Sequence, residues 1–254
     1  MRWLSRTKPS GERSRFGRSR ILRRRQVRRL LTEQLEDRRV LTTHFGTLTG
    51  NETWGAGEIH EVTADVIVPA TLTLTIEPGA IVKFHSSSDN LIVDGTLDAQ
   101  GTAAQKIIFT SIRDDVGEDS NGDGGTTLPG PGDWGQIEIN GNATLSQSLV
   151  RYGGQFFSGS QIEVYCGSLT LTDSTISESA TIGVRTVGSD PTLTNNSYVN
   201  NDVAAVSIDL DSNPAISGVT MTGNGINGLQ VDGGVLARDL VWDDPDIVYW
   251  LTDD

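Results

Sequence analysis

The second half of the chain repeats one pattern of apolar and polar positions at nearly even spacing. Each copy has an apolar residue, four mostly small or polar residues, and a second apolar residue. The five copies are Leu145–Val150, Leu171–Ile176, Leu193–Tyr198, Ile216–Met221 and Leu236–Val241. Their leading residues lie 26, 22, 23 and 20 positions apart. A fixed period in the low twenties, built from short β-runs and turn residues, predicts a solenoid.

A second, shorter apolar phrase keeps step with the first and precedes it by roughly ten residues in each coil. It occurs at Ile182–Val184, Ala204–Val206 and Asn227–Leu229. Alternating apolar residues and turn residues also predict strands through the first half of the chain. These strands are expected near residues 62–68, 72–76, 80–84, 91–97, 106–110 and 134–139.

No single coil of this length can bury its own apolar face, so the coils must stack. Stacking aligns the inward Ile, Val and Leu side chains in columns. Asn195–Asn196, Asn200–Asn201 and Gly223–Gly225 supply residue types that tolerate the left-handed backbone of sharp corners. We therefore expect an all-β fold, a single-stranded right-handed parallel β-helix of roughly eight turns with coils of roughly 22 residues. A β-sandwich is the alternative, although its hairpin signals would be stronger.

The chain has 254 residues and a formal charge of −13, which combines two opposed parts. Residues 1–41 hold fourteen Lys and Arg against four acids, a charge of +10, whereas the remainder carries −23. A basic arm ahead of an acidic body indicates two functional pieces, which we place at 1–43 and 44–254. The acidic body should repel nucleic acid and attract divalent cations or basic partners.

The basic arm should be disordered alone over its first twenty or so residues. From Ile21 to Leu35, apolar residues fall mostly on one side of a possible helix and arginines on the other. The pattern suits nucleic-acid binding, a membrane-surface helix or an export segment. An ordinary secretory signal does not fit, because the longest apolar stretch is Leu30–Leu31, far short of the ~7–15 residues required.

The end of the arm resembles the N-terminal motif of planctomycete extracellular proteins. In that motif an Arg-rich opening leads into a Leu-Glu-x-Arg-x-Leu-type box followed by small residues. Here Arg28–Leu41 supplies the opening and the box, with the closest match at Leu35–Leu41 and Thr42–Thr43 after it. The resemblance implies export and an extracellular or cell-surface location.

The body is similar to bacterial surface proteins with a pectin-lyase-like right-handed β-helix. The similarity covers about residues 50–254 and is strongest in four segments, Leu72–Phe84, Leu91–Leu97, Ile107–Ser111 and Gly132–Ile137. It implies the fold. It says little about activity, since one fold hosts many functions.

One constellation has metal-ligand spacing. Asp119, Asn121 and Asp123, followed by Gly124, match the first half of an EF-hand-type loop and are the candidate ligands for Ca2+. Position twelve, where a bidentate Glu belongs, is Gly130, although other nearby acids could substitute. The alternative is a solvated acidic insertion over residues 114–133, which is also where a functional loop would project from a solenoid.

Catalytic signals are weak, and we assign no catalytic or cofactor-binding residue. A lyase would need a basic residue as proton abstractor, and the candidates Lys83, Arg151 and Arg185 lie in no matching motif. A hydrolase would need two carboxylates facing one groove, for which Asp209 and Asp211 alternate along an expected strand. Among the other reactive types, we expect the histidines at turns or on the surface, Cys166 buried in a strand, and corner packing by Trp54, Trp134, Trp242 and Trp250, although these indoles could also stack on sugars.

The C-terminal segment from Trp242 resembles the segment from Trp54 to Asp65, with one extra residue. A Trp-rich cap explains this, but so does a unit of a tandem array that stops at a repeat boundary. The second interpretation predicts an incompletely capped last coil whose parallel edges favour end-to-end self-association.

Taken together, these patterns predict an exported, non-catalytic β-helix with a structural or adhesive role at the cell surface. The expected partners are glycans or sister surface proteins, not nucleic acid. No transmembrane helix is expected, because the sequence has no run of ~18 apolar residues. A carbohydrate-active β-helix, either lyase or hydrolase, is the alternative. A third possibility is a fragment of a larger tandem-repeat surface protein. A cluster of carboxylates and basic side chains on one lateral face would distinguish the first two.

Overall fold

The computed structural model describes residues 41–155, 159–236, 239, 241–244 and 247–252. The chain divides into two compact units, 1–37 and 38–254, and every described residue belongs to the second. The export motif before Leu41 and the expected helix of the arm lie outside the described residues. The described residues form 22 strands and no helix, so the all-β prediction is confirmed. Among them there is accordingly no helix long and apolar enough to span a membrane.

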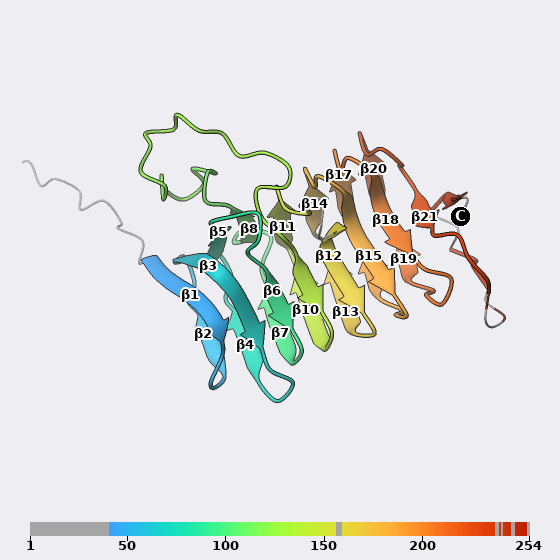
Figure 1. Ribbon diagram of the computed structural model, residues 1–254, viewed down its shortest axis with the longest axis horizontal. Coiled ribbons are helices and arrows are strands. Elements are labelled where there is room, and N and C mark those ends of the chain that lie inside the picture. The colour runs from blue at the N-terminus through green and yellow to red at the C-terminus, as the bar shows by residue number, and fades with distance from the viewer. Residues whose placement is uncertain (1–40, 156–158, 237–238, 240, 245–246, 253–254) are drawn as a thin grey trace, which may run out of the picture. The chain divides into compact units, whose positions relative to one another are not determined.

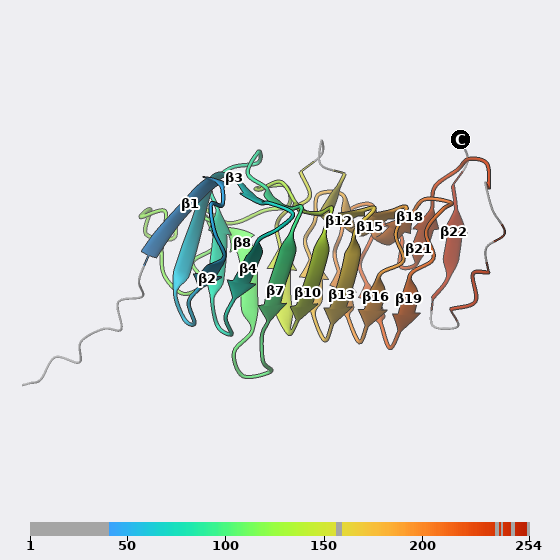
Figure 2. The ribbon, with the colours of Figure 1, turned by 90° about the horizontal axis from the view of Figure 1, so that it is seen from below.

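The strands stack into a right-handed parallel β-helix of about nine turns, with coils of about 23 residues. Each coil contributes one strand to each of three columns, which run along the molecule in Figures 1 and 2. The first column is β2 (Glu52–Trp54), β4 (Thr73–Ile76), β7 (Thr96–Gln100), β10 (Asn142–Ser146), β13 (Ser168–Thr172), β16 (Thr192–Thr194) and β19 (Ala215–Ser217).

The second column is β5 (Ile81–Phe84), β8 (Ile107–Ser111), β11 (Ser148–Arg151), β14 (Thr175–Ser177), β17 (Ser197–Val199) and β20 (Thr220–Thr222). The third is β6 (Leu91–Val93), β9 (Ile137–Ile139), β12 (Ser160–Tyr165), β15 (Ile182–Val187), β18 (Ala204–Ile208), β21 (Leu229–Val231) and β22 (Tyr249–Leu251). The long strand β3 (Ile59–Val68) begins both of these columns, and β1 (Leu41–Thr47) pairs with it.

The repeated phrases of the sequence lie in register, as predicted. Leu145 pairs with Leu171, Leu171 with Leu193, and Leu193 with Ile216. Each of these pairings is parallel, which excludes the antiparallel β-sandwich. The fifth phrase was assigned wrongly. Its ends Leu236 and Val241 are 54% and 68% exposed, and its described residues form no strand.

The corners follow from residues that adopt a left-handed backbone. Asn195 and Asn200 have φ of 56° and 54°, and Gly223 has φ of 73°, as their residue types predict. Asn196 and Asn201, the residues after the two corner asparagines, are buried, and their side chains hydrogen-bond backbone groups of the coil before. These contacts satisfy peptide groups that turn away from the sheets, as buried backbone groups require.

Three expectations for single residues are wrong. Cys166 is exposed at a corner after β12, with φ of 53°, and is not buried in a strand. His44 and His60 are buried at the N-terminal end of the core, where they contact each other and Trp54. The apolar period alone does not show that two imidazoles in contact through their ring nitrogens can occupy a core position.

The two Trp-led segments do not take equivalent places. Ile59–Val62 of β3 pairs with β5 in the second column, whereas β22 pairs with β21 in the third. The interpretation as a unit of a tandem array stays a prediction. At the N-terminal end, β1 starts at Leu41, three residues before the boundary expected between arm and body.

Candidate functional site

The insertion is the long loop between β8 and β9 (Figure 1). It contacts charged side chains on the outer face of the second column. Lys83 of β5 is fully buried and donates from Nζ to the carbonyl oxygen of Glu118 at 2.7 Å. Asp114 accepts a hydrogen bond from Thr110 and pairs with Arg151, both contacts at 2.5 Å. Two of the three candidate bases therefore hold the insertion against the solenoid, Lys83 fully buried and Arg151 partly exposed.

Burial lowers the pKa of Lys83, because desolvation penalises its charged form. The carboxylates of Asp114, Asp115, Glu118 and Glu61 oppose that shift. A cation this buried, with a carbonyl as its hydrogen-bond acceptor, serves best as an anchor for the loop above it. The predicted insertion is thus held by side-chain contacts to β5, β8 and β11.

The candidate calcium ligands lie in a tight turn at the surface of the insertion. Asp119 accepts backbone hydrogen bonds from Gly122 and Gly124, both at 2.8 Å. Asn121 donates from its amide to Asp123 at 3.0 Å. Thr127 donates to Asp123 through its hydroxyl and its backbone, and the hydroxyl contact lowers the pKa of Asp123 to about 2. Asn121 and Asp123 are therefore in side-chain contact, whereas Asp119 accepts only from backbone groups of the same turn. Ca2+ binding by the three stays a prediction.

A second set of polar and charged residues lies on the outer face of the third column, where Trp250 is exposed, Ser207 is buried and the other members are half-buried. Strand register aligns Glu138, Glu163, Arg185, Ser207, Gln230 and Trp250, one from each of six successive strands. We call these six residues the outer row. Neighbouring strands lie about 4.8 Å apart, so the row extends roughly 24 Å along the solenoid. Arg185, the third candidate base, lies in the middle of it.

Carboxylates flank Arg185 on both sides. Asp232, which follows β21, pairs with Arg185 at 2.7 Å and accepts a hydrogen bond from Ser207 at 3.2 Å. Glu138 and Glu163 are register partners on adjacent strands. Burial raises the pKa of Glu163 most, and the charge of Glu138 adds to the rise, against a hydrogen bond from Gln136 and the charge of Arg185.

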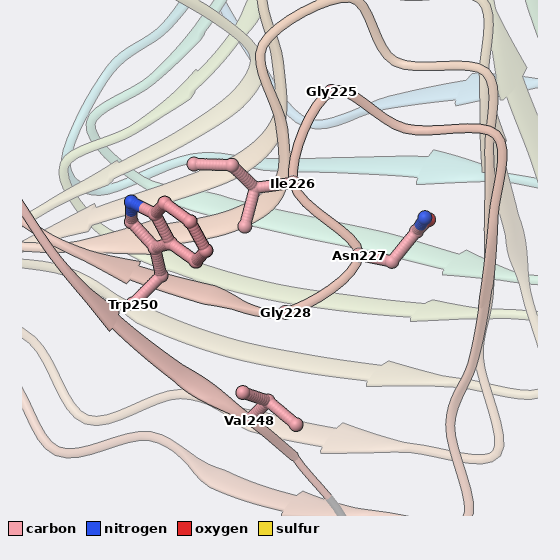
Figure 3. Close-up of a pocket in the computed structure, with 6 residues that line it drawn as sticks. All are labelled: Gly225, Ile226, Asn227, Gly228, Val248 and Trp250. Atoms are coloured by element: carbon pink, nitrogen blue, oxygen red, sulfur yellow. The ribbon is translucent and has the colours of Figure 1, made fainter.

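The outer row ends at a small apolar pocket beside Trp250. The pocket has a volume of about 290 Å³ and is lined by Gly225, Ile226, Asn227, Gly228, Val248 and Trp250. Figure 3 shows the side chain of Ile226 directed toward the indole, whereas Asn227 points away. Trp54 and Trp134 are fully buried and Trp242 is half-buried against Tyr249, but Trp250 is 57% exposed. Of the four candidate indoles, Trp250 is thus the one available to a ligand.

The carboxylate pair expected at Asp209 and Asp211 does not form a groove. Both residues follow β18 in a turn, where Asp209 accepts hydrogen bonds from Ser212 and from the backbone of Gly188 and Asp211. Their alternation in the sequence arises from a turn and not from a strand. The carboxylates that do face one side, Glu138 and Glu163, lie 25 positions apart in the sequence and were missed.

Two family models match the chain. One, described as a pectate-lyase like beta helix domain, matches residues 46–169, and the other, described as a right handed beta helix region, matches residues 133–236. The body is a right-handed parallel β-helix, and its first part, residues 46–169, is similar to pectate-lyase-like β-helix domains. No curated protein and no solved structure gives a significant match. The matches extend over the outer row up to Gln230 and leave its activity open.

Proposed function

We propose that this chain is an exported, non-catalytic β-helix of the cell surface that binds glycans along the outer row. The observation that carries the proposal is the alignment of polar side chains on a rigid solenoid face, ending at the exposed indole of Trp250. Sugar rings combine an apolar face with hydroxyl groups, so an aromatic ring beside carboxylate and amide groups suits them.

The charge of this face favours uncharged glycans. The outer row and Asp232 carry three carboxylates against Arg185, and the body outside the arm has a formal charge of −23. The negative charge of this face and that of the whole body both repel polyanions such as uronate polymers. A neutral chain laid along the row would avoid that repulsion while its hydroxyl groups replace water around the carboxylates.

One observation favours glycoside hydrolysis as a second candidate. Glu138 and Glu163 face the same side from adjacent strands, and the pKa of Glu163 is raised. A hydrolase needs one carboxylic acid to protonate the leaving oxygen while a second carboxylate stays ionised. In this alternative Glu163 is the acid and Glu138 the base or nucleophile.

The test compares binding with cleavage on the same neutral polysaccharides. Binding is measured by calorimetry or affinity electrophoresis, with a polyuronate as the charged control. Trp250→Ala should weaken binding at least tenfold, whereas Phe45→Ala, which removes an exposed aromatic ring on β1 away from the outer row, should not. Release of reducing ends that Glu163→Gln abolishes while binding persists would establish the hydrolase instead. No binding to any neutral glycan would refute the adhesive proposal.

Export is tested separately by locating the full chain in cell fractions. The proposal requires the chain in the envelope or medium, and loss of that location when the box Leu35–Leu41 is scrambled. Retention of the native chain inside the cell would contradict it.

A further inference from the structure

Strand β1 is attached to the solenoid through one buried side chain. β1 pairs with β3 along its length, and of its seven residues only His44 is buried, with 8% of its side chain exposed. Leu41 and Phe45, its other large apolar residues, are exposed. Whatever displaces His44 therefore removes the side-chain anchor of the strand that leads into the body.

The ring of His44 lies in a polar chain that crosses the end of the core. Its Nε2 is 3.0 Å from Nδ1 of His60, and its Nδ1 is 3.3 Å from a carboxylate oxygen of Glu52 on β2. Nε2 of His60 faces the carbonyl oxygen of Gly55 at 3.5 Å and Glu58 at 3.8 Å. Both imidazoles also pack on Trp54, with ring centroids 4.3 and 5.2 Å away.

The hydrogen-bonded series formed by Glu52, His44, His60 and Gly55 accommodates a limited number of protons. The four ring nitrogens have three hydrogen-bonding directions among them, toward Glu52, toward Gly55, and between the two rings. Two neutral rings carry two protons, and one added proton satisfies all three directions. A second added proton leaves two N–H groups and two positive charges facing each other at the 3.0 Å contact. The doubly protonated pair therefore cannot keep this geometry.

The surroundings of the two histidines also disfavour their protonation. Burial lowers the pKa of His44 to about 4. Burial also lowers the pKa of His60, where the charge of His44 adds to the effect and Gly55, Glu58 and Glu52 oppose it. Glu52 and Glu58 are partly exposed, so solvent screens their attraction and they offset only part of the desolvation.

We propose that β1 is an acid-releasable strand, held to the solenoid at neutral pH by the shared proton of the His44–His60 pair and detached when both rings are protonated. Release frees the edge of β3 that pairs with β1. It also exposes one side of Trp54, which is fully buried while β1 is attached. An unpaired strand edge is a template for pairing with another chain. The device thus gives the N-terminal end of the solenoid an acid-dependent surface.

The sign of the pH dependence follows from proton binding. A released histidine has a pKa near 6.5 and the packed one a lower value, so the released state binds more protons below that pH. Attachment of β1 is therefore complete above pH ~6.5 and weakens as pH falls toward about 4. The opening equilibrium should rise up to ~10-fold per pH unit in this window, or roughly 300-fold in total.

Hydrogen exchange of the full chain, expressed as protection factors to remove the intrinsic pH effect, tests the proposal at pH 7.5, 6.0 and 4.5. We expect protection of β1 amides to fall at pH 4.5 while protection of β13 stays constant. His44→Phe keeps a ring at the anchor without a titrating group and should make β1 protection independent of pH. His85→Phe, at an exposed histidine paired with Glu61, is the matched control and should behave as the parent chain.

Each outcome decides the question. Constant β1 protection from pH 7.5 to 4.5 in the parent chain overturns the proposal, and so does an equal acid-induced loss in His44→Phe. If His44→Phe does not pack β1 at pH 7.5, His60→Phe replaces it. That variant leaves His44 a single charge opposite Glu52, so the loss of protection should move to lower pH, and an unchanged midpoint would refute the shared-proton anchor.

Discussion

The buried corner residue Asn201 offers a direct test of what holds neighbouring coils together. Its side-chain oxygen accepts from the backbone N–H of Ser179 at 3.2 Å, and its amide donates to the carbonyl of Ile176 at 3.3 Å and to Asn224 at 2.8 Å. The residue is fully buried. Asn201→Ala would leave the backbone N–H of Ser179 without its acceptor, whereas the carbonyl of Ile176 keeps a hydrogen bond in the ladder between β14 and β17.

The magnitude follows from that one group. A buried polar group without a partner costs about 1–3 kcal/mol, so the free energy of unfolding should fall by roughly 2 kcal/mol. Asn224 keeps a donor, because the backbone N–H of Asn201 also reaches its side-chain oxygen, and adds little to the cost. At about 2–4 °C per kcal/mol for a domain of this size, the melting temperature should fall by roughly 4–8 °C.

The neighbouring Asn200 supplies the matched control. Asn200 has the left-handed backbone that Gly223 adopts at the same corner of the next coil, and its amide reaches Glu178 at the surface. Asn200→Gly should therefore change the free energy of unfolding by less than about 1 kcal/mol. Urea unfolding followed by circular dichroism measures both variants. A cost below about 1 kcal/mol for Asn201→Ala, or equal costs for the two variants, would refute the reasoning.

Three further predictions concern the body and its insertion. Gly95→Ala should destabilise the fold by at least about 2 kcal/mol in urea unfolding, because the added Cβ would lie 2.2 Å from the carbonyl oxygen of Pro69; an unchanged midpoint contradicts this. Lys83→Met should speed limited proteolysis within residues 112–133 without unfolding the solenoid, since the contact with Glu118 is lost; equal cleavage rates contradict the anchor. Saturating Ca2+ should raise the melting temperature of the parent chain but not that of Asp123→Ala. At 100 times the Kd, binding should add about 2.7 kcal/mol to the free energy of unfolding, and no rise excludes the site.

Much of the solenoid could be predicted because its signals are local and periodic. The phrase beginning at Leu145 recurs at Leu171, Leu193 and Ile216, and each copy must bury its apolar ends in the same way. The corner residues Asn195 and Asn200 show the turns, since few other residues accept that backbone. The periodic pattern is misleading at Leu236, where a chance match continues the period beyond the last regular coil.

The candidate site was far less predictable. Glu138 and Glu163 meet because strands β9 and β12 are in register, yet the coil that separates these two residues has 25 residues, against 22 in each of the next two coils. Outward positions carry no apolar pattern, so nothing in the sequence shows which of many acids share a face. The aspartates chosen from local alternation, Asp209 and Asp211, instead form part of a turn.

The sequence by itself thus determined the repeat, the coil length and the corner chemistry, because burying an apolar face every 22 or 23 residues constrains each coil separately. The tertiary structure alone decided that Lys83 and Arg151 hold the insertion, that His44 contacts His60, and that the outer row ends at Trp250. These contacts join residues of different coils. Stacking register sets them, and register depends on every loop length between the partners.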